Sequence, residues 1–266
     1  MSERVLYKVE GDIAFVSLNR PKKYNGLDIA MFEALVKTAK KIRKDRSIRA
    51  VILSGEGKNF SSGLDIGDLK KNPLLIGKLL VKPGVRYTNL VQEAAWCWRE
   101  LPVPVIAIIQ GKCYGGGLQI ALGADFRITK PDAEFSVLEV KWGLIPDMTC
   151  SVTFREVISI DLAKELAMTG RLFSGVEAKE MGIVSYVSDD PMPDALALAQ
   201  EISARSPDAV SAAKQLFNST WVADDKEALN IETKIQKKLL GRWNQIAAAS
   251  KNLMDKPLKY RKRKFG

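Results

Sequence analysis

The sequence predicts an α/β fold built around one core, and two observations support this prediction. Strand and helix patterns alternate through the first part of the chain, and the patterns beyond Asp161 are helical. The chain has 266 residues, of which 46% are hydrophobic and 27% are charged, as in ordinary globular proteins. A chain of this length buries most of its potential surface, so its core needs neither a disulfide nor a metal.

The first elements are a β-hairpin, a helix and a strand. Two runs of strand-forming residues, 5–9 and 13–18, flank a Gly-Asp turn. An aspartate then caps a predicted helix over 28–44, because apolar residues recur on one of its faces. A short apolar run at 50–53 predicts a buried strand, and the pattern over 89–99 predicts a second helix.

Strands and helices continue to alternate in the next part of the chain, and only helices are predicted after it. The β-branched run Val105–Ile109 predicts a strongly buried strand. The patterns then predict a loop at 111–117, a helix at 118–122, strands at 125–128 and 134–137, and helices at 162–168, 175–181, 194–205, 208–216 and 225–253. Gly241 is expected to break the last helix. We therefore predict an α/β core over 1–195 and a helical C-terminal extension over 196–266.

The absence of histidine excludes several classes of catalytic site. The sequence contains no histidine, whereas Ser-His-Asp and Cys-His systems need an imidazole base. The HExxH zinc sites and the facial-triad iron sites need imidazole ligands, so no metal site of these kinds is expected. A general base must therefore be a carboxylate or, less favourably, Lys, Tyr or Cys. Cys97, Cys113 and Cys150 match no CxxC motif and are predicted to be buried, reduced thiols.

The charge and the N-terminal sequence indicate the kind of partner and the compartment. The formal net charge is +10 at pH 7, which favours anionic partners such as a phosphorylated small molecule, nucleic acid or a membrane surface. Glu3 and Glu10 argue against a transit peptide, and no apolar segment follows that would make a secretory signal or a membrane helix. We expect a soluble, cytoplasmic protein.

Two strand–loop–helix junctions are candidate binding sites. The loops at 55–63 and 111–117 follow buried strands and contain several glycines. Glycine lets the backbone approach a ligand closely, and the first N–H groups of a following helix are free to bind an oxyanion or a phosphate. A plain tight turn is the simpler explanation of either junction taken alone. Neither GxGxxG nor GxxxxGK[ST] occurs, which argues against NAD-dependent hydride transfer and P-loop phosphoryl transfer.

Two carboxylates near the second junction are candidates for proton transfer. Glu139 follows a predicted strand, and Asp147 lies eight residues further along the chain. The residues between them are largely apolar, and a carboxylate in such surroundings has a raised pKa and can exchange protons near neutral pH. Spacing alone fits a surface position for either side chain as well.

Five segments in order resemble signatures of the enoyl-CoA hydratase/isomerase (crotonase) superfamily, and the similarity covers nearly the whole chain. A single segment of this kind has little specificity, but the ordered set identifies the chain as resembling that family. These segments are residues 19–27 (NRPKKYNGL), 57–66 (GKNFSSGLDI), 104–125, 135–146 and 178–184.

The resemblance implies a fold, a ligand and a mechanism. The fold would be a crotonase-like spiral of ββα turns, with C-terminal helices that make the contacts of a homotrimer or a dimer of trimers. The ligand would be an acyl-coenzyme A thioester, with coenzyme A as part of the substrate and no covalently bound cofactor. The backbone N–H groups of Leu64 and Gly116 would form the oxyanion hole. The residues expected to contact coenzyme A or substrate are Lys22, Ser62, Asp65, Ile66 and Gly115.

The acid–base residues depart from the family's hydratase pattern. The hydratases carry two glutamates, of which one matches Glu139, whereas Gln119 occupies the position of the other. Glutamine cannot carry a proton in that role. The spacing of Glu139 and Asp147 resembles that of the dienoyl-CoA isomerases, although their additional acid at the Gln119 position is missing here. Our hypothesis is that Glu139 and Asp147 share the proton transfers, that Gln119 positions substrate or water, and that isomerisation is favoured over hydration.

Two alternatives from other classes stay open. One is a non-catalytic acyl-CoA binder, since loss of one glutamate is compatible with loss of turnover. The other is an RNA-binding crotonase homologue, because four lysines recur at helical spacing over 37–44; a solvated helix face is the simpler interpretation, so nucleic-acid binding is not the main expectation. The basic segment 256–264 would either neutralise coenzyme A phosphates or form a solubilising end.

Overall fold

A β-hairpin opens the computed structural model, which describes residues 3–65, 67, 77, 79–82, 84, 87–254 and 257–266. Strands β1 (Val5–Glu10) and β2 (Ile13–Leu18) are antiparallel. Glu10 pairs with Ile13 beside the turn, and Val5 pairs with Leu18 at the far end. Gly11 in the turn has a φ of 62°, a left-handed conformation that glycine adopts without strain. The predicted hairpin is confirmed.

The hairpin forms one edge of a six-stranded sheet with the order β1-β2-β3-β4-β6-β9. The added strands are β3 (Ala50–Gly55), β4 (Val105–Ile109), β6 (Phe126–Thr129) and β9 (Tyr186–Val187), and each pairs in parallel with its neighbour. All five residues of β4 are buried, as expected for a central parallel strand covered on both faces. The predicted α/β class is therefore confirmed.

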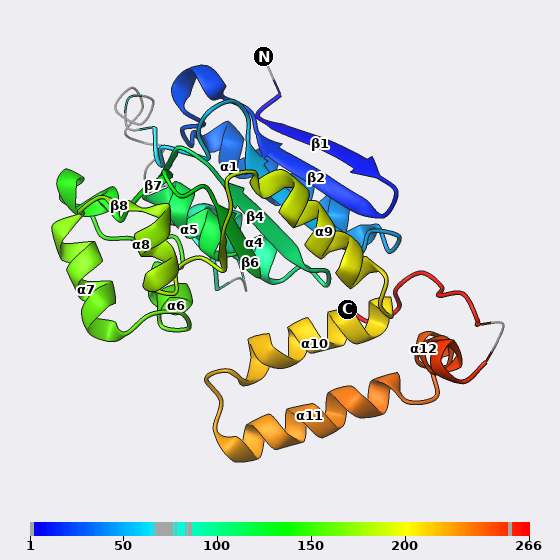
Figure 1. Ribbon diagram of the computed structural model, residues 1–266. Coiled ribbons are helices and arrows are strands. Elements are labelled where there is room, and N and C mark those ends of the chain that lie inside the picture. The colour runs from blue at the N-terminus through cyan, green and yellow to red at the C-terminus, as the bar shows by residue number, and fades with distance from the viewer. Residues whose placement is uncertain are drawn as a thin grey trace.

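Helices cover both faces of this sheet (Figure 1). On one face, α1 (Ile29–Lys44), α4 (Leu90–Arg99) and α5 (Gly116–Leu122) pack into the main hydrophobic core. On the other, α9 (Pro191–Ser203) packs Ala195 and Ala199 against alternate residues of the strands. Asp28 caps α1 as predicted, because its side chain accepts a hydrogen bond of 2.8 Å from Met31 N.

A second, three-stranded sheet was not fully predicted. It consists of β5 (Lys112–Tyr114), β7 (Glu134–Ser136) and β8 (Phe173–Ser174) in that order. β5 lies inside the segment predicted as a loop, and β8 and β9 lie in the part predicted to be helical throughout. Those two predictions were wrong because such short strands arise from pairing with distant partners, which no local residue pattern signals.

Short helices connect these strands. They are the 3₁₀ helices η1 (Pro21–Lys23) and η2 (Leu138–Trp142) and the helices α6 (Cys150–Phe154), α7 (Ile160–Thr169) and α8 (Gly175–Glu180). The three cysteines are buried and form no disulfide, as predicted. In the part of the chain that the structure covers, no helix is both long and apolar enough to cross a lipid bilayer.

Three helices follow the core at the C-terminal end. They are α10 (Pro207–Thr220), α11 (Asp225–Leu239) and α12 (Trp243–Leu253). Figure 1 shows α10 and α11 running side by side below the sheet and the chain end returning to α10. The predicted break occurs at Gly241, whose φ is 70°. The division into a core and an extension stays a prediction; its boundary at 195 falls within α9, which packs on the sheet.

Candidate active site

The two predicted junctions lie side by side. The loop that follows β3 and the strand β5 form a parallel bridge between Ser61 and Cys113. Ser61 N donates to Lys112 O at 3.0 Å, and Tyr114 N donates to Ser61 O at 2.9 Å. A methyl group at Gly117 would lie 2.7 Å from the Ser61 side chain, so glycine is required for this approach. Residues about fifty positions apart thus form one site.

Two backbone N–H groups at this site have no acceptor among the described residues. In the bridge between Leu27 and Leu64, Leu27 N donates to Gly63 O and Asp65 N donates to Leu27 O, so the N–H of Leu64 points to the other side. Gly116 is the first residue of α5, and its N–H therefore has no partner within the helix. Within the described residues neither group donates a hydrogen bond. A methyl group at Gly63 would lie 3.3 Å from Gly116 N, which places the two predicted donors close together.

The conformation of Gly115 makes room for Glu139. Its φ is 49°, and its N–H donates to Ser136 O at 2.9 Å, which ties α5 to the end of β7. The chain continues from β7 into η2, which carries Glu139. A methyl group at Gly115 would lie 3.0 Å from Glu139 Oε1. Any larger residue would push this carboxylate out of place.

Glu139 is a mostly buried carboxylate with one free oxygen. Its Oε1 accepts a hydrogen bond of 2.7 Å from Gln119 Nε2. Its Oε2 is buried and accepts no hydrogen bond in the described structure. Burial raises the pKa of Glu139, the charge of Asp147 raises it further, and hydrogen bonds from the backbone and from Gln119 partly oppose the increase. This is the combination expected of a group that exchanges protons near neutral pH.

Asp147 completes the set of three predicted catalytic residues. It lies in the turn that precedes α6, beside the exposed apolar side chains of Leu144 and Ile145. Asp147 is exposed to solvent, yet partial desolvation raises its pKa as well. The next residue, Met148, donates its N–H to Gln119 Oε1 at 2.8 Å. The structure therefore brings Gln119, Glu139 and Asp147 into one neighbourhood.

Two of the residues predicted to bind coenzyme A, Ser62 and Asp65, lie against the loop that follows η1. Ser62 N donates to Tyr24 O, and a methyl group at Gly26 would lie 3.6 Å from Ser62 Oγ and 3.7 Å from Asp65 Cβ, so this segment packs against the loop that follows η1. Lys22 is exposed on η1. Ile66 lies outside the described residues.

Two residues that contribute to the site were missed in the sequence. Arg20 donates to Gly26 O at 2.6 Å and to Asp65 at 3.0 Å, and so holds the loop after η1 against Asp65. Its only sequence signal is its place in the first family signature. Met148 packs on Gly116, where a methyl group would lie 2.8 Å from its Sδ. No pattern indicated Met148, because the contact depends on folding α6 back onto α5.

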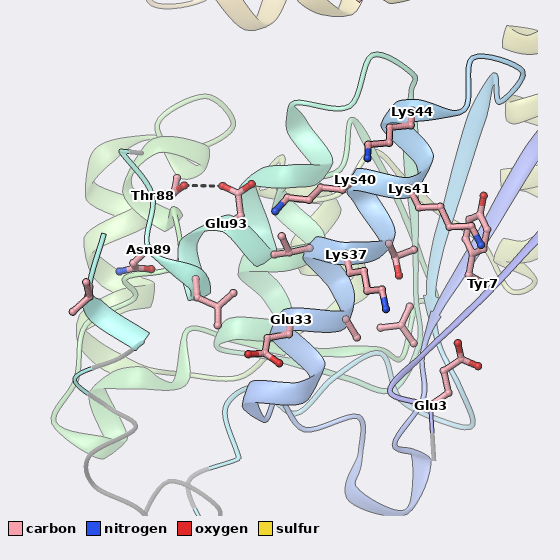
Figure 2. Close-up of a pocket in the computed structure, with 16 residues that line it drawn as sticks. Glu3, Tyr7, Glu33, Lys37, Lys40, Lys41, Lys44, Thr88, Asn89 and Glu93 are labelled. Atoms are coloured by element: carbon pink, nitrogen blue, oxygen red, sulfur yellow. Dashed lines mark hydrogen bonds between the residues drawn. The ribbon is translucent and has the colours of Figure 1, made fainter. Parts of the chain in front are cut away.

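The lysine-rich face of α1 lies elsewhere. Its lysines line a groove of about 1220 Å³ whose floor includes Val5 and Val36, and Figure 2 shows glutamates at its edges. None of the predicted catalytic residues lines this groove. Among the described residues, three glutamates offset most of the charge of the four lysines, so the groove offers little net positive charge to a phosphate backbone. The charged residues that line it are Glu3, Glu33, Lys37, Lys40, Lys41, Lys44 and Glu93.

Comparison with known sequences gives consistent matches. A protein-family model described as "Enoyl-CoA hydratase/isomerase" matches residues 8–246. An enoyl-CoA hydratase of Mycobacterium tuberculosis is 32% identical over 237 residues, which is 86% of each chain. The mitochondrial Delta(3,5)-Delta(2,4)-dienoyl-CoA isomerase of Rattus norvegicus is 37% identical over 220 residues, which is 76% of this chain and 64% of that protein.

Comparison with solved structures supports the same fold. The crystal structure of an enoyl-CoA hydratase from Bacillus anthracis superimposes with a TM-score of 0.88 at 26% identity and covers 97% of this chain and 98% of its own. The crystal structure of an enoyl-CoA hydratase from Thermoplasma volcanium superimposes with a TM-score of 0.84 at 27% identity, over 94% of this chain and 97% of that chain. The fold expected from the sequence signatures is confirmed.

Proposed function

Because the chain belongs to the enoyl-CoA hydratase/isomerase family, we propose that it binds an acyl-coenzyme A thioester and stabilises the thioester enolate, with double-bond isomerisation favoured over hydration. The observation that carries this proposal is the buried Glu139 carboxylate next to two backbone N–H groups. Among the described residues, Glu139 Oε2 has no hydrogen-bond donor and the two N–H groups have no acceptor. The names of the relatives, which include hydratases and dienoyl-CoA isomerases, are consistent with it.

The thioester carbonyl binds between Leu64 N and Gly116 N in this proposal. When a proton leaves the carbon next to the carbonyl, the electron pair moves onto the carbonyl oxygen. Two preorganised donors stabilise that oxyanion without having to reorganise, and removing one such donor typically costs about 3–4 kcal/mol of transition-state stabilisation. The side chain of Leu64 takes no part, because only its backbone N–H contacts the oxygen.

The proton transfers fall to Glu139 and Asp147. One carboxylate removes the proton from the carbon next to the carbonyl, and the other returns a proton at a carbon further along the conjugated chain. The double bond moves, no atom is gained or lost, and each carboxylate ends in the other protonation state. Both pKa values are raised by desolvation, which suits groups that must both give and take protons.

Isomerisation fits the site better than hydration. Addition of water needs a group that deprotonates water and a group that protonates carbon, and two carboxylates facing the same water would supply both. Here the side chain that contacts Glu139 is the amide of Gln119, which carries no exchangeable acid proton. Coenzyme A is part of the substrate in this scheme, and no other cofactor takes part.

The coenzyme A moiety is proposed to lie along residues 62–66, with Gly115 beside the thioester and Lys22 near a phosphate. Lys22 is exposed and has no ion-pair partner within the described part of the chain, so its charge is available to an anion.

An oligomer is proposed from the family resemblance and from exposed apolar side chains. Large apolar residues are exposed both on the α7–α8 side and on the C-terminal helices, and exposed patches of this kind commonly mark contact surfaces. We propose a homotrimer or a dimer of trimers in which these surfaces meet. They include Trp142, Ile145, Ile160 and Met168 on the first side and Phe217, Trp221, Leu229 and Leu253 on the second.

The test is turnover in D₂O. The purified enzyme is incubated with 2-enoyl-, 3-enoyl- and 3,5-dienoyl-CoA esters, and products are read by mass. We expect a shifted double bond with deuterium incorporated, and a loss of about 10²–10⁴-fold in rate for Glu139→Gln and for Asp147→Asn separately. Glu134→Gln, an exposed neighbour on β7, should keep the wild-type rate.

Each other outcome would change the proposal. Hydration of 2-enoyl-CoA without isomerisation would show that one glutamate suffices for water addition. Tight thioester binding with no turnover of any ester would favour the non-catalytic alternative. Full activity in Glu139→Gln would rule out the assigned base.

A further inference from the structure

The side chain of Gln119 is held at both ends by protein groups. It is 2% exposed in α5. Its Oε1 accepts hydrogen bonds from Met148 N at 2.8 Å and from Cys150 N at 3.3 Å. Its Nε2 donates to Glu139 Oε1 at 2.7 Å. These contacts join α5, η2 and the start of α6 through one amide.

The contacts leave only one orientation of this amide. A flipped amide would place its NH₂ group against the two backbone N–H donors of Met148 and Cys150, and donor would face donor. The oxygen of Gln119 must therefore face α6, and its N–H must face Glu139. The side chain thus offers Glu139 a donor that does not titrate, and both of its polar atoms are engaged by protein groups.

The same contact distinguishes the two oxygens of Glu139. Oε1 accepts the Gln119 N–H, while Oε2 is buried and has no partner in the part of the chain that the structure describes. Gly115 packs closely against the carboxylate, which restricts its rotation. The two oxygens are therefore not interchangeable.

We propose that Gln119 is a positioning residue, which holds the ionised Glu139 through Oε1 and leaves Oε2 as the single oxygen that exchanges protons with the substrate. This inference rests on the proposed function, and it assigns Gln119 to the orientation of Glu139 rather than of substrate or water. A carboxylic acid at position 119 would act differently. Two carboxyl groups within hydrogen-bond distance share a proton, and the pair loses its second proton only at a higher pH.

The first test compares Gln119→Glu with the wild type. A glutamate keeps an oxygen that accepts from Met148 N and Cys150 N, so the fold should be retained, as checked by thermal melting. We expect the acid limb of kcat/KM for deuterium exchange to move up by at least about one pH unit. Binding of a saturated acyl-CoA, measured by calorimetry, should change by less than about threefold, since both polar atoms of Gln119 bond to protein groups.

A second variant keeps the inference falsifiable if the first does not fold. Gln119→Met removes the donor and adds no titratable group. We expect kcat to fall by about 10²-fold, the usual result of a misplaced catalytic group, without a new titration in the profile. Wild-type kcat and an unchanged pH profile in these variants would overturn the positioning role.

A spectroscopic readout separates this inference from the proposed function. The infrared carboxylate band of Glu139, identified by subtracting the Glu139→Gln spectrum, is titrated in the wild type and in Gln119→Glu. A clear displacement of the titration supports the inference, and coincident titrations contradict it, whether or not any ester is turned over. Absence of turnover in the wild type would contradict only the proposed function.

Discussion

Glu139 shows at the scale of one residue how the protein holds a reactive group. Its carboxylate is placed where burial and the charge of Asp147 both disfavour ionisation, and its Oε2 has no compensating hydrogen bond. A buried acceptor without a donor reduces the stability of the fold. Such local costs are typical of functional sites, where stability and activity make opposing demands.

This cost predicts a pH-dependent difference in stability. The folded-state pKa of Glu139 is raised, so its contribution to stability is fully present below the unfolded pKa of about 4.3 and is lost as the pH rises through the folded pKa. Glutamine does not ionise, so Glu139→Gln abolishes the loss of stability that ionisation of Glu139 causes. At neutral pH the variant should be more stable than the wild type by about 0.5–2 kcal/mol, and the gain should shrink at pH 4.

Urea unfolding at several pH values measures this difference. Glu201→Gln, at an exposed position on α9, is the control and should show no such pH dependence. A Glu139→Gln variant that is less stable than the wild type at every pH would show that Oε2 has a partner in solution.

At the scale of elements, the turn at Gly115 between β5 and α5 positions the proposed catalytic groups. Gly115 has a positive φ, its N–H binds β7, and its missing side chain leaves the space that Glu139 occupies. The same turn places Gly116 N close to Gly63, the residue that precedes Leu64. One glycine therefore affects both the proposed oxyanion hole and the proposed base.

Replacing this glycine should reduce activity more than stability. Gly115→Ala places a methyl group 3.0 Å from Glu139 Oε1 at a φ of 49°. The backbone at Gly115, with φ 49° and ψ −121°, lies outside the left-handed helical region, and such a sparsely populated conformation costs a residue other than glycine about 1–3 kcal/mol. Displacement of a catalytic group costs about 10²-fold in turnover. Gly11→Ala is the matched control: its φ is 62° but nothing lies within 4 Å of the added carbon.

Melting temperature and turnover are measured for both variants. The control should also lose stability, because its φ is positive, but it should keep its activity. Equal turnover in the two variants would show that contact with Glu139 does not matter for the reaction.

At the scale of the whole molecule, a buried lysine and a returning chain end attach the C-terminal helices to the core. Lys214 on α10 donates to Trp98 O and Val103 O at 3.0 Å each and to Asp125 at 2.7 Å, and its side chain is 7% exposed. Asp208, near the start of α10, accepts hydrogen bonds from Lys264 N and Phe265 N. These contacts fix α10, from which α11 projects.

Removal of the lysine should loosen this attachment. Lys214→Met leaves two carbonyls without a donor and Asp125 without its cation, and breaking a buried ion pair from one side costs about 3 kcal/mol or more. Urea unfolding measures the loss, and limited proteolysis should cut near α10 sooner. Lys226→Met, at an exposed position on α11, is the control and should change stability by less than about 0.5 kcal/mol. An unchanged unfolding free energy for Lys214→Met would contradict the assigned attachment.

The sequence alone determined the class of fold and most of its elements. The hairpin, α1 with its Asp28 cap, β4 and the break at Gly241 are confirmed because each is encoded by a local pattern of apolar, capping or glycine residues. The ordered signatures indicated the family, and the absence of histidine limited the base to a few residue types. The site assignments and the compartment stay predictions.

Only the tertiary structure decided how the site is assembled. Strands as short as β5, β8 and β9 form only because partners far along the chain supply their hydrogen bonds. The contacts of Gln119 could not be predicted either. The sequence shows an amide where the hydratases carry a carboxylate, but it does not show that the amide accepts a hydrogen bond from Met148 N and donates one to Glu139. Local patterns reflect the short-range preferences of the chain, whereas hydrogen-bond direction and burial depend on contacts between segments that only folding brings together.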